Sequence, residues 1–215
     1  MKIQIISLFP EMFPGVFNAS MLWKAQEQGA VEFSYVNLRD FGLGPRKQVD
    51  DTPYGGGDGM LLKPEPLVAA IEHAKTTCPD AVVILPTPRG QLYKQSHAKE
   101  LAASNQDLIL VCARYEGYDE RVTEYVDQQF CIGNYVLTGG ELPAMIIADS
   151  VVRLLPGVLG GETSAEKESF QADDQSIEHP QYTRPEDFRG KKVPDVLLSG
   201  HHGEIAKWRQ AGKTD

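Results

Sequence analysis

Cysteine is scarce in this chain. Only three occur among 215 residues, Cys78, Cys112 and Cys131, and no two of them form a Cys-x-x-Cys pair. An odd number without paired spacing argues against a disulfide framework, and the missing pair argues against a structural zinc site. We therefore expect neither, and we expect a protein of the reducing cytoplasm.

Long apolar runs are also absent. No stretch approaches the roughly 18 consecutive apolar residues that a membrane helix needs, and residues 1–6 lack the apolar core and cleavage site of a signal peptide. The pattern predicts a soluble cytoplasmic protein with no membrane partner. A length of 215 residues suits one large domain, or one domain with a small appendage.

Positive charge is in the minority. Lys and Arg number 21 against 30 Asp and Glu, which gives a net charge of −9. This composition argues against a general nucleic-acid coat, because non-specific affinity comes mainly from cations that neutralise phosphates. Locally the balance reverses, since residues 184–213 hold seven basic and four acidic side chains. That segment is consistent with a phosphate-contacting surface, and also with a solvated face of mixed charge.

Two common nucleotide-binding motifs are missing. No Lys-Ser or Lys-Thr follows the glycine-dense residues 55–59 in the spacing of a P-loop, and no G-x-G-x-x-G opens a helix after a strand. Four of the five positions at 55–59 are glycine, so holding them rigid costs conformational entropy. We expect a mobile loop that orders on a ligand; an ordinary surface loop is the alternative.

The chain does contain an alternation of strands and helices. Apolar and β-branched runs predict strands at 3–9, 31–38, 81–85 and 107–112. Apolar periodicity predicts helices at 11–28, 64–75, 95–103, 142–155 and 203–210. Strand followed by helix followed by strand predicts an α/β fold, with a mostly parallel sheet flanked by helices.

Glycine bounds one apolar stretch on both sides. The strand formers Tyr135 to Leu137 lie between Gly133 and the pair Gly139-Gly140, which suggests that bare backbone is needed there, either by a ligand or by a simple β-turn. Two other predicted strands run into Gly- or Pro-rich loops, at 86–90 and 113–117. Because ligands of open α/β sheets bind at the carboxyl ends of strands, we expect one shared pocket.

Five sequence blocks follow one another along nearly the whole chain: IISLFPEMF at 5–13, VDDTPYGGG at 49–57, RYEG at 114–117, GGELPAM at 139–145 and YTRP at 182–185. Together they closely resemble the bacterial tRNA (guanine-N1)-methyltransferases, members of the SPOUT superfamily of trefoil-knotted methyltransferases. The resemblance implies a knotted α/β cofactor-binding domain at 1–160, a flexible interdomain linker at 161–180, and a short C-terminal tRNA-binding segment with a helical extension at 181–215. General rules of chain topology would not have predicted a knot.

The resemblance also implies ligands and partners. S-adenosylmethionine is expected to bind the knot loops, and the substrate is expected to be tRNA, methylated at N1 of guanosine 37 next to the anticodon by a homodimer. The cofactor-binding positions carried over are Leu85, Pro86, Thr87, Pro88, Gly90, Ala113, Tyr115, Glu116, Gly117, Ile132, Gly133, Tyr135, Leu137, Gly139 and Gly140. The substrate-binding positions are Asp50, Tyr54, Gly55, Gly56, Gly57, Gly59 and Arg184.

Some positions depart from the family pattern. Residues 85–90 read Leu-Pro-Thr-Pro-Arg-Gly where the family usually has Tyr-Leu-Ser-Pro-Gln-Gly, and Ala113 stands where it usually has glycine. The chain stops soon after Trp208-Arg209, where the family usually continues through a basic helical segment. We therefore expect tRNA binding to be weak and sensitive to salt.

The resemblance implies two catalytic residues, Glu168 and Arg153. Guanine N1 carries a proton at neutral pH, so methylation there calls for a general base, and a carboxylate is a suitable one. The family has aspartate where Glu168 stands before Ser169-Phe170; Asp173 and Asp174 are the alternative bases. Arg153 is expected to stabilise negative charge on guanine O6.

Several alternatives stay open at this level. The chain has the sequence pattern of a tRNA methyltransferase, but a knotted methyltransferase acting on another RNA or base, and a non-catalytic RNA-binding module of the same fold, fit the same residues. The adjacent His201 and His202 point apart on regular backbone, so we expect no metal ligands there. Whether Mg²⁺ assists the reaction is left open.

Overall fold

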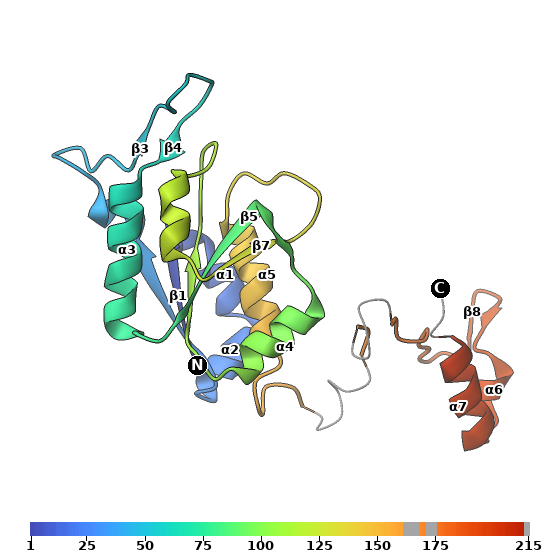
Figure 1. Cartoon of the computed structure of the whole chain (residues 1–215). Coiled ribbons are helices and arrows are strands. Elements are labelled where there is room, and N and C mark those ends of the chain that lie inside the picture. Colours follow the sequence, from blue (N-terminus) through green and yellow to red (C-terminus); the bar gives the residue numbers. More distant parts are fainter. Residues whose placement is uncertain (161–167, 171–175, 213–215) are drawn as a thin grey trace. The chain divides into compact units, whose positions relative to one another are not determined.

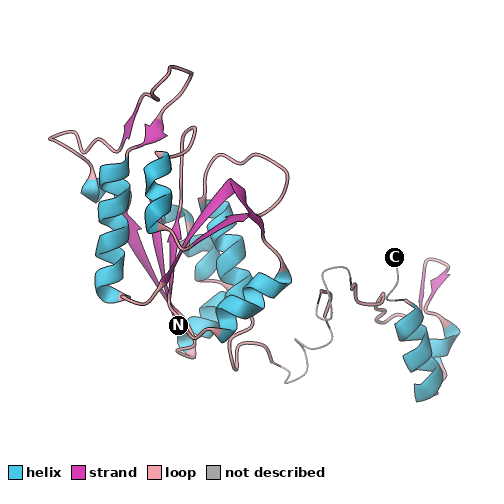
Figure 2. Ribbon diagram, viewed as in Figure 1, coloured by secondary structure: helices cyan, strands magenta, loops and turns pink. Residues whose placement is uncertain are grey.

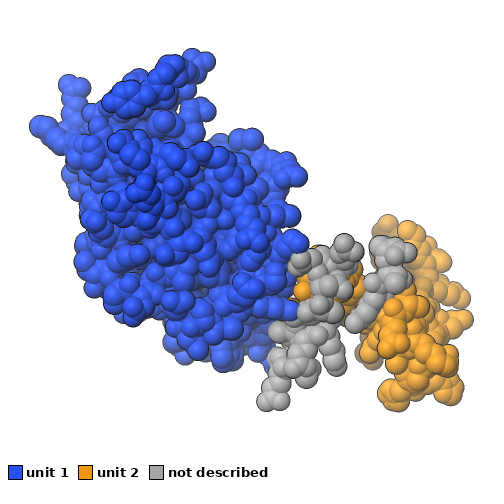
Figure 3. All heavy atoms as spheres, viewed as in Figure 1, with its two compact units in different colours: residues 1–160 blue, residues 161–215 orange. Residues whose placement is uncertain are grey.

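The computed structural model describes residues 1–160, 168–170 and 176–212. The chain divides into two compact units, residues 1–160 and residues 161–215 (Figure 3). The roles expected of 161–180 as a linker and of 181–215 as a tRNA-binding segment stay predictions.

The first unit is built on one sheet (Figures 1 and 2). Its strands are β1 (Lys2–Ser7), β2 (Glu32–Asn37), β5 (Val82–Leu92), β6 (Leu108–Val111) and β7 (Gln128–Cys131). They lie in the order β2-β1-β6-β5-β7, and each neighbouring pair is parallel. The predicted α/β fold with a parallel sheet is confirmed, while the threading of the knot stays a prediction.

Both faces of the sheet are buried. Along β6, Leu108 and Leu110 belong to one core cluster, whereas Ile109 and Val111 belong to the other. Successive side chains of a strand point to opposite faces, so a strand covered on both sides needs a continuous apolar run. The uninterrupted apolar sequence at 108–112 is explained by this double burial.

Helices cover the sheet on both sides. The core cluster on one face includes residues of α1 (Pro14–Phe17), α2 (Ser20–Glu27), α4 (Gln95–Ala103) and α5 (Glu141–Val152). The cluster on the other face includes residues of α3 (Pro64–Thr77) and of the 3₁₀ helices η2 (Leu38–Phe41) and η3 (Glu120–Tyr125). In Figure 1, α3 accordingly lies on one side of the sheet, and α4 and α5 on the other.

The single helix predicted at 11–28 is wrong. A 3₁₀ turn, η1 (Pro10–Met12), precedes α1, and the extended backbone of Ala19 (φ −131°, ψ 154°) separates α1 from α2. Phe17 is fully buried in α1, and Leu22 is 3% exposed in α2. A spacing of five residues does not fall on one face of a continuous helix, so the break is what lets both side chains reach the core.

The third strand end lies earlier in the chain than predicted. Residues 135–137 form part of a loop, where Val136 is 91% exposed, and the strand is β7, which ends at Cys131. The strand predicted at 81–85 is longer than expected, because β5 leaves the ladder after Pro86 and pairs with β7 again at Gln91. Such a bulge directs the residues within it out of the sheet.

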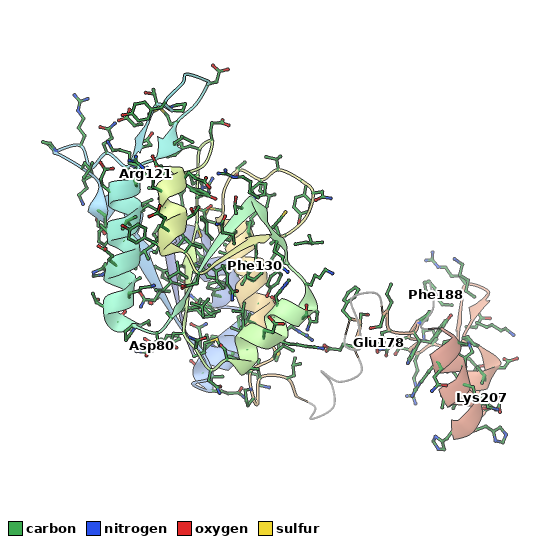
Figure 4. All side chains as sticks on the ribbon, in the orientation of Figure 1. Asp80, Arg121, Phe130, Glu178, Phe188 and Lys207 are labelled. Atoms are coloured by element: carbon green, nitrogen blue, oxygen red, sulfur yellow. The ribbon has the colours of Figure 1, made fainter. Side chains whose placement is uncertain are left out.

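Short ribbons and helices complete the chain. β3 (Asp50–Asp51) pairs antiparallel with β4 (Leu61–Leu62), and this ribbon carries the loop 52–60. The second unit contains the hairpin of β8 (Asp187–Phe188) and β9 (Lys191–Lys192), followed by α6 (Asp195–Leu198) and α7 (His202–Ala211). Figure 4 labels Phe188 on this hairpin and Lys207 on α7. The helix predicted at 203–210 is confirmed, and the ribbons were not predicted.

Truncating Leu110 tests the assignment of the core. Leu110 is fully buried in β6, while Leu43, a residue of the same type, is 41% exposed in a loop. We expect Leu110→Ala to lower the free energy of unfolding by about 2–5 kcal/mol, because it removes buried methyl groups and leaves a cavity. Leu43→Ala, the control, should cost less than about 1 kcal/mol. Urea titration followed by circular dichroism measures both, and equal effects would contradict the assignment.

Candidate functional site

A cavity of about 560 Å³ lies where three strands end. The bulge of β5 contributes residues 86–89, and the chain after β6 contributes 113–118. The end of β7 with its following loop contributes 130–133 and 135–140. In a parallel sheet these carboxyl ends reach the same edge, which is where such folds bind ligands. The pocket expected from the sequence is therefore present in the structure.

Most residues expected at the cofactor line this cavity. They are Pro86, Thr87, Pro88, Ala113, Tyr115, Glu116, Gly117, Ile132, Gly133, Tyr135, Leu137, Gly139 and Gly140. Leu85 and Gly90 do not. The Leu85 side chain is fully buried in the core under α3. A methyl group on Gly90 would lie 2.5 Å from the backbone of Gln129 and Phe130, so this glycine serves the packing of the bulge against β7.

Several lining residues were not singled out by sequence reasoning. They are Leu61, Arg89, Arg114, Tyr118, Glu120, Phe130, Cys131, Val136, Thr138 and Pro143. Four of them, Arg89, Arg114, Val136 and Thr138, lie within the loops 85–90, 113–117 and 132–140 that were expected to bind the cofactor, although they were not chosen individually. Cys131 directly precedes the last of these loops, so proximity in sequence could have indicated it. Phe130 was hidden because no strand had been predicted at 128–131; it is labelled on β7 in Figure 4.

The loop at 113–117 is fixed by backbone hydrogen bonds to the β3–β4 ribbon. The Glu116 N–H donates to the carbonyl of Met60 at 3.0 Å, and the Leu62 N–H donates to the carbonyl of Gly117 at 2.9 Å. Gly117 has φ +128°, a left-handed conformation that favours glycine. The base of the glycine-dense loop is thus tied to the wall of the cavity.

The loop at 132–140 keeps much of its backbone unpaired. Within the described part of the chain, the N–H groups of Ile132, Leu137 and Thr138 make no hydrogen bond to another backbone carbonyl. Tyr135 is 56% exposed, and its ring occupies the space that a side chain on Gly133 would need. The loop therefore presents free peptide donors next to aromatic and aliphatic side chains, a combination that suits a heterocyclic ligand.

The glycine pair at 139–140 is required by contacts within the protein. A methyl group on Gly140 would lie 2.8 Å from the Cα of Cys112, and Gly140 itself donates to the carbonyl of Ala113 at 2.8 Å. A methyl group on Gly139 would overlap the Arg114 side chain. Bare backbone is needed here, as expected, because the Cys112 and Ala113 backbone and the Arg114 side chain leave no space for side chains at 139 and 140.

A buried ion pair lies behind these glycines. Glu141, the first residue of α5, is 1% exposed, and its Oε2 lies 2.9 Å from the Nε of Arg114. The Ser7 hydroxyl donates to Oε1 of the same carboxylate at 2.7 Å. The Nε–Oε2 contact lacks the direction of a hydrogen bond, so its attraction is that of two opposite charges.

Burial and charge also act on the thiol of Cys112. This residue is fully buried at the end of β6. Desolvation raises the pKa of the thiol well above its usual value, the negative charge of Glu141 raises it further, and the positive charge of Arg114 opposes the shift. At neutral pH Cys112 is therefore a neutral, inert part of the core.

The mouth of the cavity is polar. Arg89 in the β5 bulge pairs with Glu120 of η3 at 2.6 Å, and both side chains are about two-thirds exposed. Below them the Tyr118 hydroxyl donates to Oγ1 of the nearly buried Thr87 at 3.3 Å. At this exposure the Arg89–Glu120 pair contributes little to stability, but it sets the charge at the entrance.

The residues expected at the substrate are divided between the two units. Tyr54 is fully exposed, and its neighbours Gly55, Gly56 and Gly57 all have positive φ. Gly59, also with positive φ, packs against the Glu116 side chain. The remaining two are Asp50, half-buried in β3, and Arg184, exposed in the second unit.

The two expected catalytic residues belong to different units. Arg153 is half-buried and forms the C-terminal cap of α5, where its N–H donates to the carbonyl of Asp149. Glu168 is half-buried in the second unit. The alternative bases Asp173 and Asp174 lie outside the described residues.

Among residues 1–160, 168–170 and 176–212, no three His, Cys, Asp or Glu side chains gather as a metal site would require.

An apolar groove lies beside α5. It is lined by Val16, Ile132, Tyr135, Leu137, Leu142, Met145, Ile146, Asp149 and Ser150. Leu142 is 48% exposed and Ile146 is 46% exposed, although both lie on a helix that is otherwise largely buried.

None of the described helices is both long enough and apolar enough to cross a membrane.

Comparisons with known proteins agree with one another. A family model described as tRNA (Guanine-1)-methyltransferase TrmD matches residues 1–215. A tRNA (guanine-N(1)-)-methyltransferase of Geobacillus kaustophilus is 54% identical over 211 residues, which span 98% of this chain and 85% of that protein. One of Halalkalibacterium halodurans is 56% identical over 212 residues, with the same coverage. The crystal structure of tRNA (m1G37) methyltransferase from Aquifex aeolicus superposes with a TM-score of 0.80 and 36% identity, covering 97% of this chain and 87% of that one.

Substitution of Gly140 tests the close approach of α5 to β6. Gly140→Ala should lower the free energy of unfolding by about 1–3 kcal/mol, because the added methyl group has no space against Cys112 and Ala113. Gly15→Ala is the matched control, since nothing lies within 4 Å of a methyl group there and Gly15 is in a helix. Thermal unfolding of both variants decides the point. A Gly140→Ala protein as stable as the control would refute the assigned packing.

Proposed function

Because the chain belongs to the tRNA (guanine-1)-methyltransferase family, we propose that the cavity at the ends of β5, β6 and β7 binds S-adenosylmethionine. As a member of that family the protein is an enzyme, and it transfers a methyl group to N1 of guanosine 37 in tRNA. Identity above 50% over nearly the whole chain favours this activity over another RNA target and over a non-catalytic module.

The cavity suits S-adenosylmethionine in size and chemistry. Its volume of about 560 Å³ falls within the roughly 300–1,000 Å³ of small-molecule sites. Pro86, Ile132 and Leu137 would contact the faces of the adenine ring, and the free backbone N–H groups at 132–138 would hydrogen-bond its edge. When bound, S-adenosylmethionine supplies a methyl group on a positively charged sulfur, which makes that methyl electrophilic. The lining residues would orient this methyl and exclude water.

Glu168 is proposed as the general base. The lone pair of guanine N1 becomes nucleophilic only as its proton leaves, and a carboxylate within hydrogen-bond reach would accept that proton. Glutamate is one methylene longer than the aspartate usual in the family, and a displacement on the order of 1 Å can cost about 100-fold in rate. The segment around Glu168 therefore has to adjust, or Asp173 or Asp174 takes the role.

Arg153 is proposed to stabilise the negative charge that loss of the N1 proton leaves on the guanine ring. As the N1 proton leaves, negative charge gathers on guanine O6, and a guanidinium donating there would lower the barrier by about 2–4 kcal/mol. Its position at the end of α5, half-buried, suits a side chain that must be held in place while it donates.

The remaining expected residues are proposed to hold the tRNA. Asp50, Tyr54 and the glycines at 55–59 would form the guanosine-binding side, with the loop closing over the nucleotide. Arg184 and the basic residues at 184–213 would contact phosphates, within a C-terminal tRNA-binding segment reached through the linker 161–180. Mg²⁺ remains a candidate helper, and the cytoplasm is the proposed location.

We also propose a homodimer, in which each tRNA site is built from both chains. The groove beside α5 exposes Val16, Leu142 and Ile146 to between 44% and 48%. An exposed row of large aliphatic side chains on a largely buried helix is costly in water and typical of an interface. A second copy of the chain would cover this face by the twofold symmetry common among soluble oligomers.

The catalytic assignment is tested with two substitutions. Glu168→Gln removes the base and Arg153→Ala removes the donor to O6, so each should cut turnover at least about 100-fold while S-adenosylmethionine affinity changes little. Glu178→Gln, another half-buried acid of the second unit, is the control and should keep normal turnover. Single-turnover methylation of unmodified tRNA and calorimetry with S-adenosylmethionine are the measurements. Normal turnover in Glu168→Gln together with its loss in Asp173→Asn would move the base to Asp173.

The dimer is tested by its mass in solution. We expect sedimentation to give twice the chain mass of 23.7 kDa at micromolar concentration. Ile146→Asp should produce a monomer, because it buries a charge in the apolar contact. Leu43→Asp also replaces an aliphatic side chain by aspartate, but at an exposed residue outside the groove. This control variant should remain dimeric. A wild-type monomer would refute the proposal.

A further inference from the structure

We propose that Glu141 is a positioning residue for the methyl-donor site. Glu141 does not line the cavity, yet together with Ser7 it would fix Arg114, which joins the segments that do. The inference rests on the proposed binding of S-adenosylmethionine in that cavity. It assigns a role to a buried charge that the methyl-transfer chemistry itself does not use.

Glu141 is held from two sides. Its Oε1 accepts a hydrogen bond from the fully buried Ser7 hydroxyl at 2.7 Å, and its Oε2 lies 2.9 Å from Nε of Arg114. It is also the first residue of α5, where the partial positive charge of a helix N-terminus favours a carboxylate. Three favourable contacts keep a negative charge at a site that is 1% exposed.

Arg114 joins its own loop to two other segments. Its Nη1 donates to the carbonyl of Thr138 at 3.3 Å, in the loop 132–140. Its guanidinium carbon lies 4.6 Å from the centre of the Phe9 ring, and Nη2 lies 3.1 Å from Sδ of Met12. Arg114 itself belongs to the loop 113–117. One side chain thus connects two walls of the cavity to the chain that follows β1.

The glycine at 139 is part of the same arrangement. A methyl group there would overlap Arg114 and would lie 2.6 Å from Oε2 of Glu141. The block Gly139-Gly140-Glu141 therefore acts as one unit: Gly139 leaves space for the ion pair, Gly140 lets α5 approach β6, and Glu141 supplies the charge. These contacts within the protein require the glycine pair, in addition to its place in the lining of the cavity.

Stability alone is a weak explanation of this pair. Taking two charges out of water costs about as much as their attraction returns, and apolar replacements of similar size are often equally stable. A pair retained behind a cavity therefore calls for another role. Thr138 and Arg114 line the cavity, whereas Ser7 and Glu141 lie behind it. The role that this arrangement suggests is to hold the loops 113–117 and 132–140 at a fixed distance from each other.

The test uses Glu141→Gln, which keeps the shape of the side chain and removes its charge. We expect S-adenosylmethionine affinity, measured by calorimetry on the full chain, to fall at least about tenfold. In methylation assays the KM for S-adenosylmethionine should rise, while the KM for tRNA should stay within about twofold. The matched control is Asp40→Asn, which removes a carboxylate from the exposed Lys47–Asp40 pair outside the cavity; its affinity should equal that of the wild type.

Ser7→Ala provides a second route if Glu141→Gln does not fold. It leaves both charges in place and removes the hydrogen bond to Oε1, together with the bond that the Ser7 hydroxyl accepts from the Phe9 N–H at 2.9 Å. Affinity should fall about threefold or more. A folded Glu141→Gln or Ser7→Ala protein that binds S-adenosylmethionine as tightly as the control would overturn the inference. A wild-type protein that does not bind S-adenosylmethionine would instead overturn the proposed donor site.

Discussion

The approach of helix α5 to the end of strand β6 shapes the first unit around its cavity. Gly140 donates its N–H to the carbonyl of Ala113 at 2.8 Å, and no side chain at 140 fits against the Cys112 backbone. Because α5 begins so close to β6, the loop before it lies beside the loop 113–117, and both line one cavity. The bulge of β5 supplies residues 86–89 to the same space.

Charge is distributed differently inside the site and at its entrance. Glu141 is almost completely buried, so removing its partner would leave an uncompensated charge in a low-dielectric interior. Arg89 and Glu120 pair at the mouth with about two-thirds of each side chain in water, where solvent and salt screen the attraction. The inner pair is therefore suited to holding geometry, and the outer pair can open at little cost.

Several exposed apolar residues lie together in the groove beside the same helix. Buried residues of α5 such as Ile147 and Val151 belong to the core, whereas Leu142 and Ile146 face outward beside Val16. Residues of the groove also line the cavity, since Ile132, Tyr135 and Leu137 belong to both. A chain that covered the groove would therefore contact the loop that borders the donor site, which links the proposed dimer to the proposed binding of the methyl donor.

Local sequence determined four of the five strands of the sheet, the bounds of α4 and most of the loops that line the cavity. These features depend on side-chain periodicity and on Gly and Pro within a few residues, so a single chain displays them. The break before α2 was missed because it depends on the packing of both Phe17 and Leu22 into the core, which the local sequence does not show. The bulge of β5 depends on pairing with β7, a partner far along the chain.

The sequence alone also identified Gly139 and Gly140 as positions that need bare backbone, through the conformational cost of placing glycine there. Only the tertiary structure decided what lies against them. Arg114 and Glu141 are distant in sequence, and neither periodicity nor composition indicates that they meet behind the glycines. Pairing between distant side chains depends on how the sheet and helices pack, because that packing alone sets which atoms come within a few ångströms.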